Sequence, residues 1–129
     1  MNLEVGNFRK SVLIVDGHST DASPELIRNE VEGKPNVYFI RLDGNGGYAG
    51  NNVEGYKYAV NVLGADYVVF MNNDFIAEPD SLRRMFDYLV KNEYTGVQGL
   101  ELRPDGLIGN AGMMHDEFAR VVSICGGTP

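Results

Sequence analysis

Three short apolar runs, each followed at once by polar residues, constrain the fold of this chain more than any other feature. They are residues 11–16 (SVLIVD), 37–42 (VYFIRL) and 67–71 (YVVFM). Uninterrupted β-branched and aromatic residues are typical of strands that are buried on both faces of a sheet. Because amphipathic stretches separate these runs, the sequence predicts an α/β fold: a mostly parallel sheet with helices on both faces.

The stretches between the runs carry helix signals. Pro24 directly follows a serine that can act as an N-cap, which predicts a helix that ends near Glu32. Apolar and aromatic residues recur at helical spacing over residues 48–63, and a third helix is expected over residues 79–91. Beyond it we expect a fourth strand at residues 96–102 (GVQGLEL), followed by a turn at RPDG.

Size and charge narrow the classes of function. The 129 residues suffice for one domain, so we expect a single domain over residues 1–129. With 11 Lys and Arg against 18 Asp and Glu, the net charge is −7, which argues against nucleic acid and anionic membranes as direct partners.

No apolar stretch approaches the roughly 20 residues of a membrane span, and residues 1–10 lack the apolar run of a signal peptide. We therefore expect a cytoplasmic protein.

Ligands of parallel α/β sheets bind beyond the carboxyl ends of the strands, and Asp16 stands at the end of the first run. A carboxylate there can accept a hydrogen bond from a ring N–H, such as the one that a pyrimidine base offers. The alternative is a purely local role. Ser19, Thr20 and Asp21 follow closely, and all of them are typical turn and helix-capping residues.

A glycine-rich loop follows the second run. Residues 43–55 (DGNGGYAGNNVEG) include five glycines, and Gly44, Gly46 and Ala49 spell GxGxxA, the fingerprint of a Rossmann NAD(P)-binding site. That fingerprint normally follows the first strand of a domain and is completed by an acid about 20 residues later, which is not well placed here. A tight loop that needs positive φ is the other alternative.

The third run opens directly into Asn72, Asn73 and Asp74. One carboxylate and two amides at a strand end suit a hard divalent cation, such as Mg²⁺ or Mn²⁺, whose other ligands would be water and phosphate oxygens. A polar turn with a helix cap is the alternative interpretation of the same three residues.

Taken together and in order, three segments resemble the nucleotide-binding half of the family 2 glycosyltransferases, especially the rhamnosyltransferase-like members. The segments are VLIVDGHSTDASPELI, IRLDGNGGYAGNNVEGYKYA and ADYVVFMNNDFIAEPDSL, and the resemblance runs from about residue 11 to residue 112. It implies a truncated GT-A fold that binds a nucleotide-diphosphate sugar and a divalent metal, for transfer of the sugar to an acceptor hydroxyl.

The resemblance also implies roles for particular residues. Asp16 would contact the nucleotide base, and Asp74 would bind Mg²⁺ or Mn²⁺ at the diphosphate. The nucleotide-sugar site would comprise Asp16, Ser19, Asn45, Gly47, Asn72 and Asn73. Gly17 and His18 depart from the family's usual Asn-Gly pair. No catalytic base is assigned, because the late carboxylates Asp116 and Glu117 suit a solvated segment.

Two parts of the family pattern have no counterpart here: the first strand, which would lie between the runs ending at Asp16 and Met71, and the acceptor half. We therefore expect a chain that is incomplete as an enzyme alone and that closes its sheet by direct pairing of these runs or by forming a homodimer. A non-catalytic remnant or interaction module of the same fold is the alternative, and an NAD(P)-binding protein is a weaker one.

Overall fold

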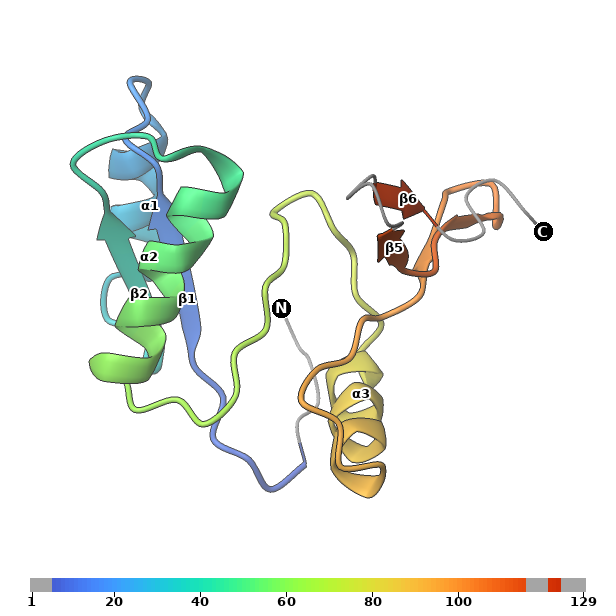
Figure 1. Cartoon of the computed structure of the whole chain (residues 1–129). Helices are drawn as coiled ribbons and strands as arrows, with labels where there is room; N and C mark the ends of the chain where they lie inside the picture. Colours follow the sequence, from blue (N-terminus) through green and yellow to red (C-terminus); the bar gives the residue numbers. More distant parts are fainter. Residues whose placement is uncertain (1–5, 116–120, 124–129) are drawn as a thin grey trace. The chain divides into compact units, whose positions relative to one another are not determined.

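The computed structural model describes residues 6–115 and 121–123 (Figure 1). It has two compact units: one spans Phe8–Phe75, and the other contains residues 6–7 and the described residues from Ile76 onward. No helix among the described residues is long and apolar enough to cross a membrane. The single domain over residues 1–129 and the cytoplasmic location stay predictions.

The first unit is built on two parallel strands. Strand β1 (Val12–Asp16) leads into helix α1 (Ser23–Val31), and β2 (Val37–Arg41) leads into α2 (Gly47–Asn61). The strands pair in parallel from Val12 opposite Val37 to Asp16 opposite Arg41. The order of strands and helices predicted for residues 11–63 is thus confirmed, with boundaries that agree to within one or two residues.

The two helices cover opposite faces of this pair of strands. Phe39 of β2 lies on the face that meets α1, because the guanidinium of Arg28 lies 6.0 Å from the centre of its ring. Val15 pairs with Ile40, the next residue along β2, and so points to the other face. There its Cγ2 lies only 3.0 Å from where a Cβ on Gly55 of α2 would stand. Helices on both faces, as predicted, can be followed in Figure 1.

The prediction of a strand at residues 67–71 is wrong. The segment has no strand pairing in the described part of the chain, and β1 pairs there with β2 alone. Direct pairing of the first and third runs is therefore not observed. The apolar composition predicted burial, but a strand also needs a neighbour for its N–H and C=O groups. Without one, Val69, Phe70 and Met71 remain 55%, 53% and 42% exposed.

The second unit contains helix α3 (Ser81–Lys91) and short antiparallel ladders. Strand β3 (Glu101–Leu102) pairs with β4 (Ile108–Asn110), and β5 (Met113–His115) pairs with β6 (Val121–Ser123). The predicted helix is confirmed with a start two residues later. Of the strand predicted at residues 96–102, only the last two residues, which lie next to the RPDG turn, pair with another strand.

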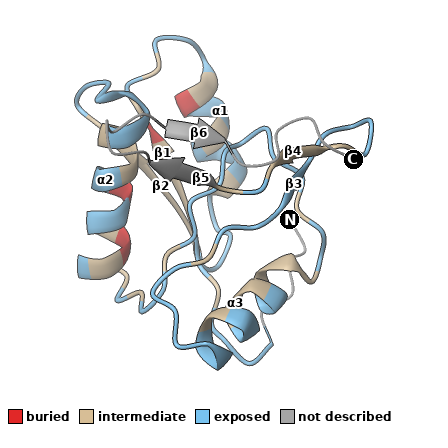
Figure 2. Ribbon diagram, turned by 45° about the vertical axis from the view of Figure 1, so that its right-hand side comes forward, coloured by how far each residue is buried: buried red, intermediate tan, exposed pale blue. Residues whose placement is uncertain are grey.

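Burial that leaves less than about a tenth of the residue surface exposed is confined to a few positions, which Figure 2 marks in red. Within the part of the chain whose burial is described, these are Asp16 at the end of β1, Pro24 at the start of α1, and Gly55 and Ala59 on α2. Three of the four are small or apolar, as helix-to-strand packing requires. The fourth is a carboxylate at 6% exposure, and a buried charge needs polar partners.

Candidate functional site

The carboxyl ends of β1 and β2 lie side by side. Asp16 and Arg41 are paired residues at the last position of each strand, and the N–H of Leu42 donates to the carbonyl oxygen of Asp16 at 2.9 Å. The loop to α1 and the glycine-rich loop to α2 therefore begin at the same point. This is the edge at which parallel α/β sheets bind ligands.

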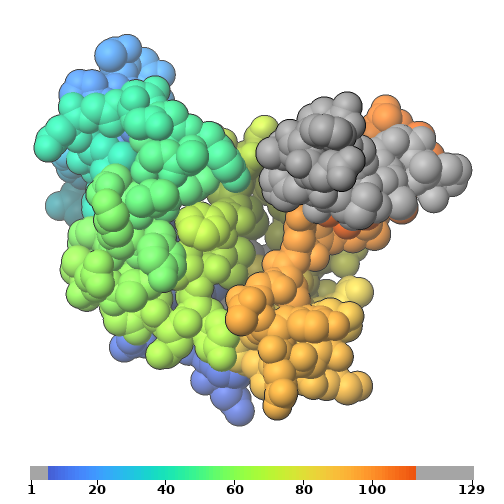
Figure 3. Space-filling model, viewed as in Figure 1, coloured from blue at the N-terminus to red at the C-terminus, as the bar shows by residue number. Residues whose placement is uncertain are grey.

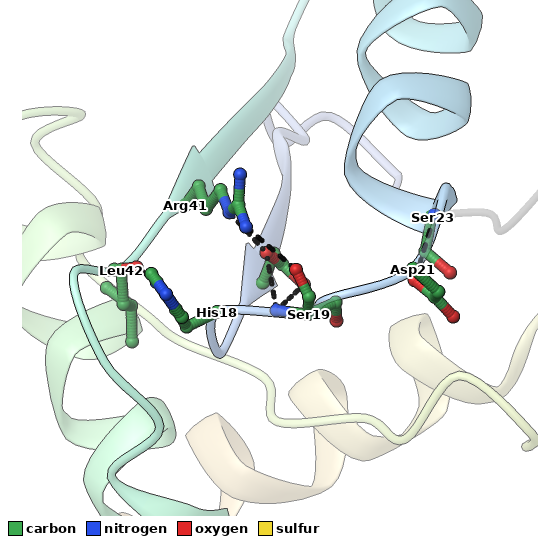
Figure 4. Close-up of polar contacts among 7 residues, drawn as sticks. His18, Ser19, Asp21, Ser23, Arg41 and Leu42 are labelled. Atoms are coloured by element: carbon green, nitrogen blue, oxygen red, sulfur yellow. Dashed lines mark hydrogen bonds and ion pairs between the residues drawn. The ribbon is translucent and has the colours of Figure 1, made fainter.

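The Asp16 carboxylate is held by three contacts. The backbone N–H of Ser19 lies 3.2 Å from both Oδ1 and Oδ2, and Arg41 Nε lies 3.3 Å from Oδ2. Arg41 Nη2 also donates to the carbonyl oxygen of Ser19 at 2.7 Å. Figure 4 shows these contacts as dashed lines between Arg41 and the loop at Ser19. The structure thus brings Asp16 and Ser19 together, with Ser19 contributing its backbone.

His18 connects the two loops. Its backbone has a φ of +68°, a conformation that histidine adopts more readily than most residues with a side chain. Its Nδ1 lies 3.1 Å from the carbonyl oxygen of Leu42, so the tautomer with a proton on Nδ1 donates a hydrogen bond there (Figure 4). His18, one of the two residues that depart from the pattern of the resembled family, therefore connects the first loop to the residue that follows β2.

The glycine-rich loop is closed by two asparagines. Asn45 Oδ1 accepts hydrogen bonds from Gly47 N at 2.9 Å and from Asn51 Nδ2 at 3.3 Å. Asn51 Oδ1 accepts one from Gly46 N at 3.1 Å. Gly47 has a φ of +70°, which favours glycine. The structure brings Asn45 and Gly47 together in a tight loop with positive φ, the local alternative raised by the sequence.

Asn51 also reaches the first loop. A Cβ built on Gly17 would stand 2.2 Å from Asn51 Nδ2, so the asparagine amide lies directly against this glycine. Neither the contacts of Arg41 nor the contact of Asn51 with Gly17 was predicted from the sequence. A charged residue that ends an otherwise apolar strand was the available signal for Arg41, and a glycine where the family has a side chain was the signal for Asn51.

A shallow hollow of about 360 Å³ lies beside the glycine-rich loop. It is lined by Leu42, Asp43, Gly44, Gly46, Gly50, Asn51 and Glu54. Figure 3 shows that this loop and α2 form a continuous surface of the first unit, coloured cyan to green. The N–H groups of Gly46 and Gly47 already donate to the two asparagines, and Asp43 and Glu54 add negative charge, so an anionic group in this hollow would need a cation beside it.

The predicted metal residues lie on an exposed turn. Asn72, Asn73 and Asp74 are all exposed, and the N–H of Phe75 donates to the carbonyl oxygen of Asn72 at 3.3 Å. Among the described residues, no hydrogen bond or ion pair joins this turn to Asp16 or Asn45, and no three His, Cys, Asp or Glu side chains form a metal-binding group. The oxygen donors fit a cation that takes most of its ligands from water and a diphosphate.

The remaining candidates from the sequence either have local roles or lie outside the residues that the structure describes. Asp21 Oδ1 accepts a hydrogen bond from Ser23 N at 3.0 Å, and this bond is the main reason that the pKa of Asp21 is lowered. The bond closes a local turn before α1, which is the turn role expected as the alternative for Asp21, whereas the N-cap of α1 is Ala22 rather than the expected serine and makes no side-chain cap bond. Asp116 and Glu117 lie outside the described residues.

The family model for glycosyl transferase family 2 matches residues 3–116, which include every residue of the candidate site. The chain belongs to glycosyl transferase family 2. Its parallel β1 and β2 with flanking helices form part of the α/β, GT-A fold of that family. The family transfers sugars from nucleotide-sugar donors, so the match favours the glycosyltransferase interpretation over the NAD(P) alternative. Neither the curated proteins nor the solved structures give a match.

Proposed function

We propose that the chain binds a nucleotide-diphosphate sugar beyond the carboxyl ends of β1 and β2, for transfer of the sugar to an acceptor hydroxyl. The observation that carries this proposal is the Asp16 carboxylate, which is nearly buried where the two loops meet. Among the residues that the structure describes, Oδ1 has a single contact, from Ser19 N, whereas Oδ2 also contacts Arg41. Oδ1 therefore retains the capacity to accept a ring N–H from a nucleotide base.

A divalent cation completes the proposal. A chain with a net charge of −7 binds a diphosphate poorly unless a cation offsets the repulsion. Asp74, with Asn72 and Asn73, would hold Mg²⁺ or Mn²⁺, since hard oxygen donors suit both ions. When bound, such an ion neutralises charge on the leaving diphosphate. Asn45 and Gly47 would shape the loop beside the donor, and Ser19 would fix Asp16.

A thermal-shift panel tests this function. The full chain is mixed with UDP-glucose, with dTDP-rhamnose or with NAD⁺, each with Mn²⁺ and with excess chelator. We expect a nucleotide sugar to raise the melting temperature only with Mn²⁺, and Asp74→Asn to reduce that rise. Asp66→Asn is the matched control, because it removes an exposed carboxylate elsewhere in the first unit. A rise with NAD⁺ alone, or an equal rise in chelator, would contradict the proposal.

The exposed apolar segment at residues 67–71 supports a further proposal, that a second copy of the chain associates there. Exposed apolar side chains that lie close together favour association between chains. Val69 and Phe70 are more than half exposed. Sedimentation at micromolar concentration should give a dimer in the wild type and a monomer in Phe70→Lys. A wild-type monomer across that range would contradict self-association.

A further inference from the structure

Arg41 holds two parts of the candidate site with one side chain. It contacts Asp16 Oδ2 through Nε at 3.3 Å and donates to the carbonyl oxygen of Ser19 through Nη2 at 2.7 Å. We infer that Arg41 is a positioning residue, which orients the Asp16 carboxylate and fixes the loop at Ser19 so that Oδ1 is presented to a ligand. The ligand part of this inference rests on the proposed nucleotide-sugar function.

The register of the sheet places Arg41 for this role. Asp16 and Arg41 are direct partners in the parallel ladder, so their side chains leave the same face of the sheet at its carboxyl edge. The guanidinium is planar and its donors have fixed directions. One rigid group can therefore bond to the carboxylate and to the neighbouring loop at the same time.

The contacts differentiate the two oxygens of Asp16. Within the described part of the chain, Oδ2 contacts both Ser19 N and Arg41 Nε, whereas Oδ1 contacts Ser19 N alone. The terminal torsion of aspartate is broad, so the carboxylate would otherwise turn easily. Arg41 removes this freedom, because turning the carboxylate would break its contact with Nε.

Geometry matters more here than charge. The Arg41 side chain is 41% exposed, so water screens its Coulomb attraction to Asp16. A lysine would keep the charge but has one compact ammonium group without the diverging donors. If Arg41 acts by position, lysine will not replace it. If it acts by charge alone, lysine will.

The test compares wild type with Arg41→Lys, Arg41→Gln and Arg9→Gln. Arg9→Gln is the matched control, because it removes the same charge from an exposed position in the same unit. Calorimetric titration with UDP and Mn²⁺ should show affinity reduced by about tenfold in both Arg41 variants, the loss typical of an outer-shell partner. The control should stay within about twofold of wild type.

A second readout needs no ligand. Amide hydrogen exchange of Ser19, followed by NMR, should be about tenfold faster in both Arg41 variants, because the loop opens more often. The amides of β1 should exchange as in wild type. If Arg41→Gln fails to fold, Arg41→Lys decides alone.

The two readouts separate the outcomes. Wild-type affinity in Arg41→Lys, or unchanged Ser19 exchange in both variants, would overturn the positioning role. If wild type itself binds none of UDP, dTDP and GDP, the proposed function fails. The exchange measurement still decides whether Arg41 fixes the loop.

Discussion

The side-chain amide of Asn51 occupies the space that a Cβ on Gly17 would need, with Nδ2 only 2.2 Å from that position. The same asparagine is bonded to Asn45 Oδ1 and to Gly46 N. One residue on α2 therefore joins the loop after β1 to the loop after β2. The absence of a side chain at position 17 is what allows this contact.

A double-mutant cycle on this contact is the first prediction. Gly17→Ala should displace the Asn51 amide and break its two hydrogen bonds, which lowers the free energy of unfolding by about 1–2 kcal/mol. Asn51→Ala removes the same two hydrogen bonds and also the amide group with which a Cβ at position 17 would collide. The double variant should thus lose about 1 kcal/mol less than the sum of the single variants, as measured by urea unfolding. Additive losses would show that the two residues do not interact.

Positive φ at Gly47 leads to the second prediction. A Cβ at this position would meet nothing within 4 Å, so Gly47→Ala tests the backbone conformation alone. A φ of +70° should cost alanine about 1 kcal/mol in unfolding free energy. Gly44→Ala is the matched control, since its surroundings are equally open and its φ is not positive. Equal stability of the two variants would contradict the loop conformation.

The third prediction concerns the pH dependence of the turn that Asp21 forms before α1. The hydrogen bond from Ser23 N lowers the pKa of Asp21 below its usual 3.8. A carboxyl whose pKa is lower in the folded state stabilises the fold above that usual value, and the contribution disappears as the pH falls through the folded pKa. An NMR titration should give Asp21 a midpoint below 3.8. A midpoint at or above 3.8 would contradict the hydrogen bond between Ser23 N and the Asp21 carboxylate.

The elements that were predicted correctly are those whose formation depends on residues close to one another in the sequence. The helices over 24–32 and 48–63 and the first two strands follow from apolar spacing and from Pro24. The segment at 67–71 carries the same apolar signal, but its pairing depends on a strand elsewhere, which composition does not reveal. Local pattern also singled out Asp16.

The contacts of Arg41 and Asn51 could be identified only from the structure. The contact between Arg41 and Asp16 depends on strand register, which places residues 25 positions apart in the chain opposite each other. Asn51 reaches Gly17 because α2 begins where the glycine-rich loop turns back. Neither relationship leaves a periodic signal in the sequence.

The central claim is that the Asp16 carboxylate binds the nucleotide. Its most direct test is calorimetric titration of UDP with Mn²⁺ into wild type, Asp16→Asn and the Asp66→Asn control, with folding verified by circular dichroism. The account predicts saturable binding in wild type and the control, and an affinity at least about tenfold lower in folded Asp16→Asn, because charge-assisted hydrogen bonds are strong. Equal affinity in all three proteins would contradict the claim.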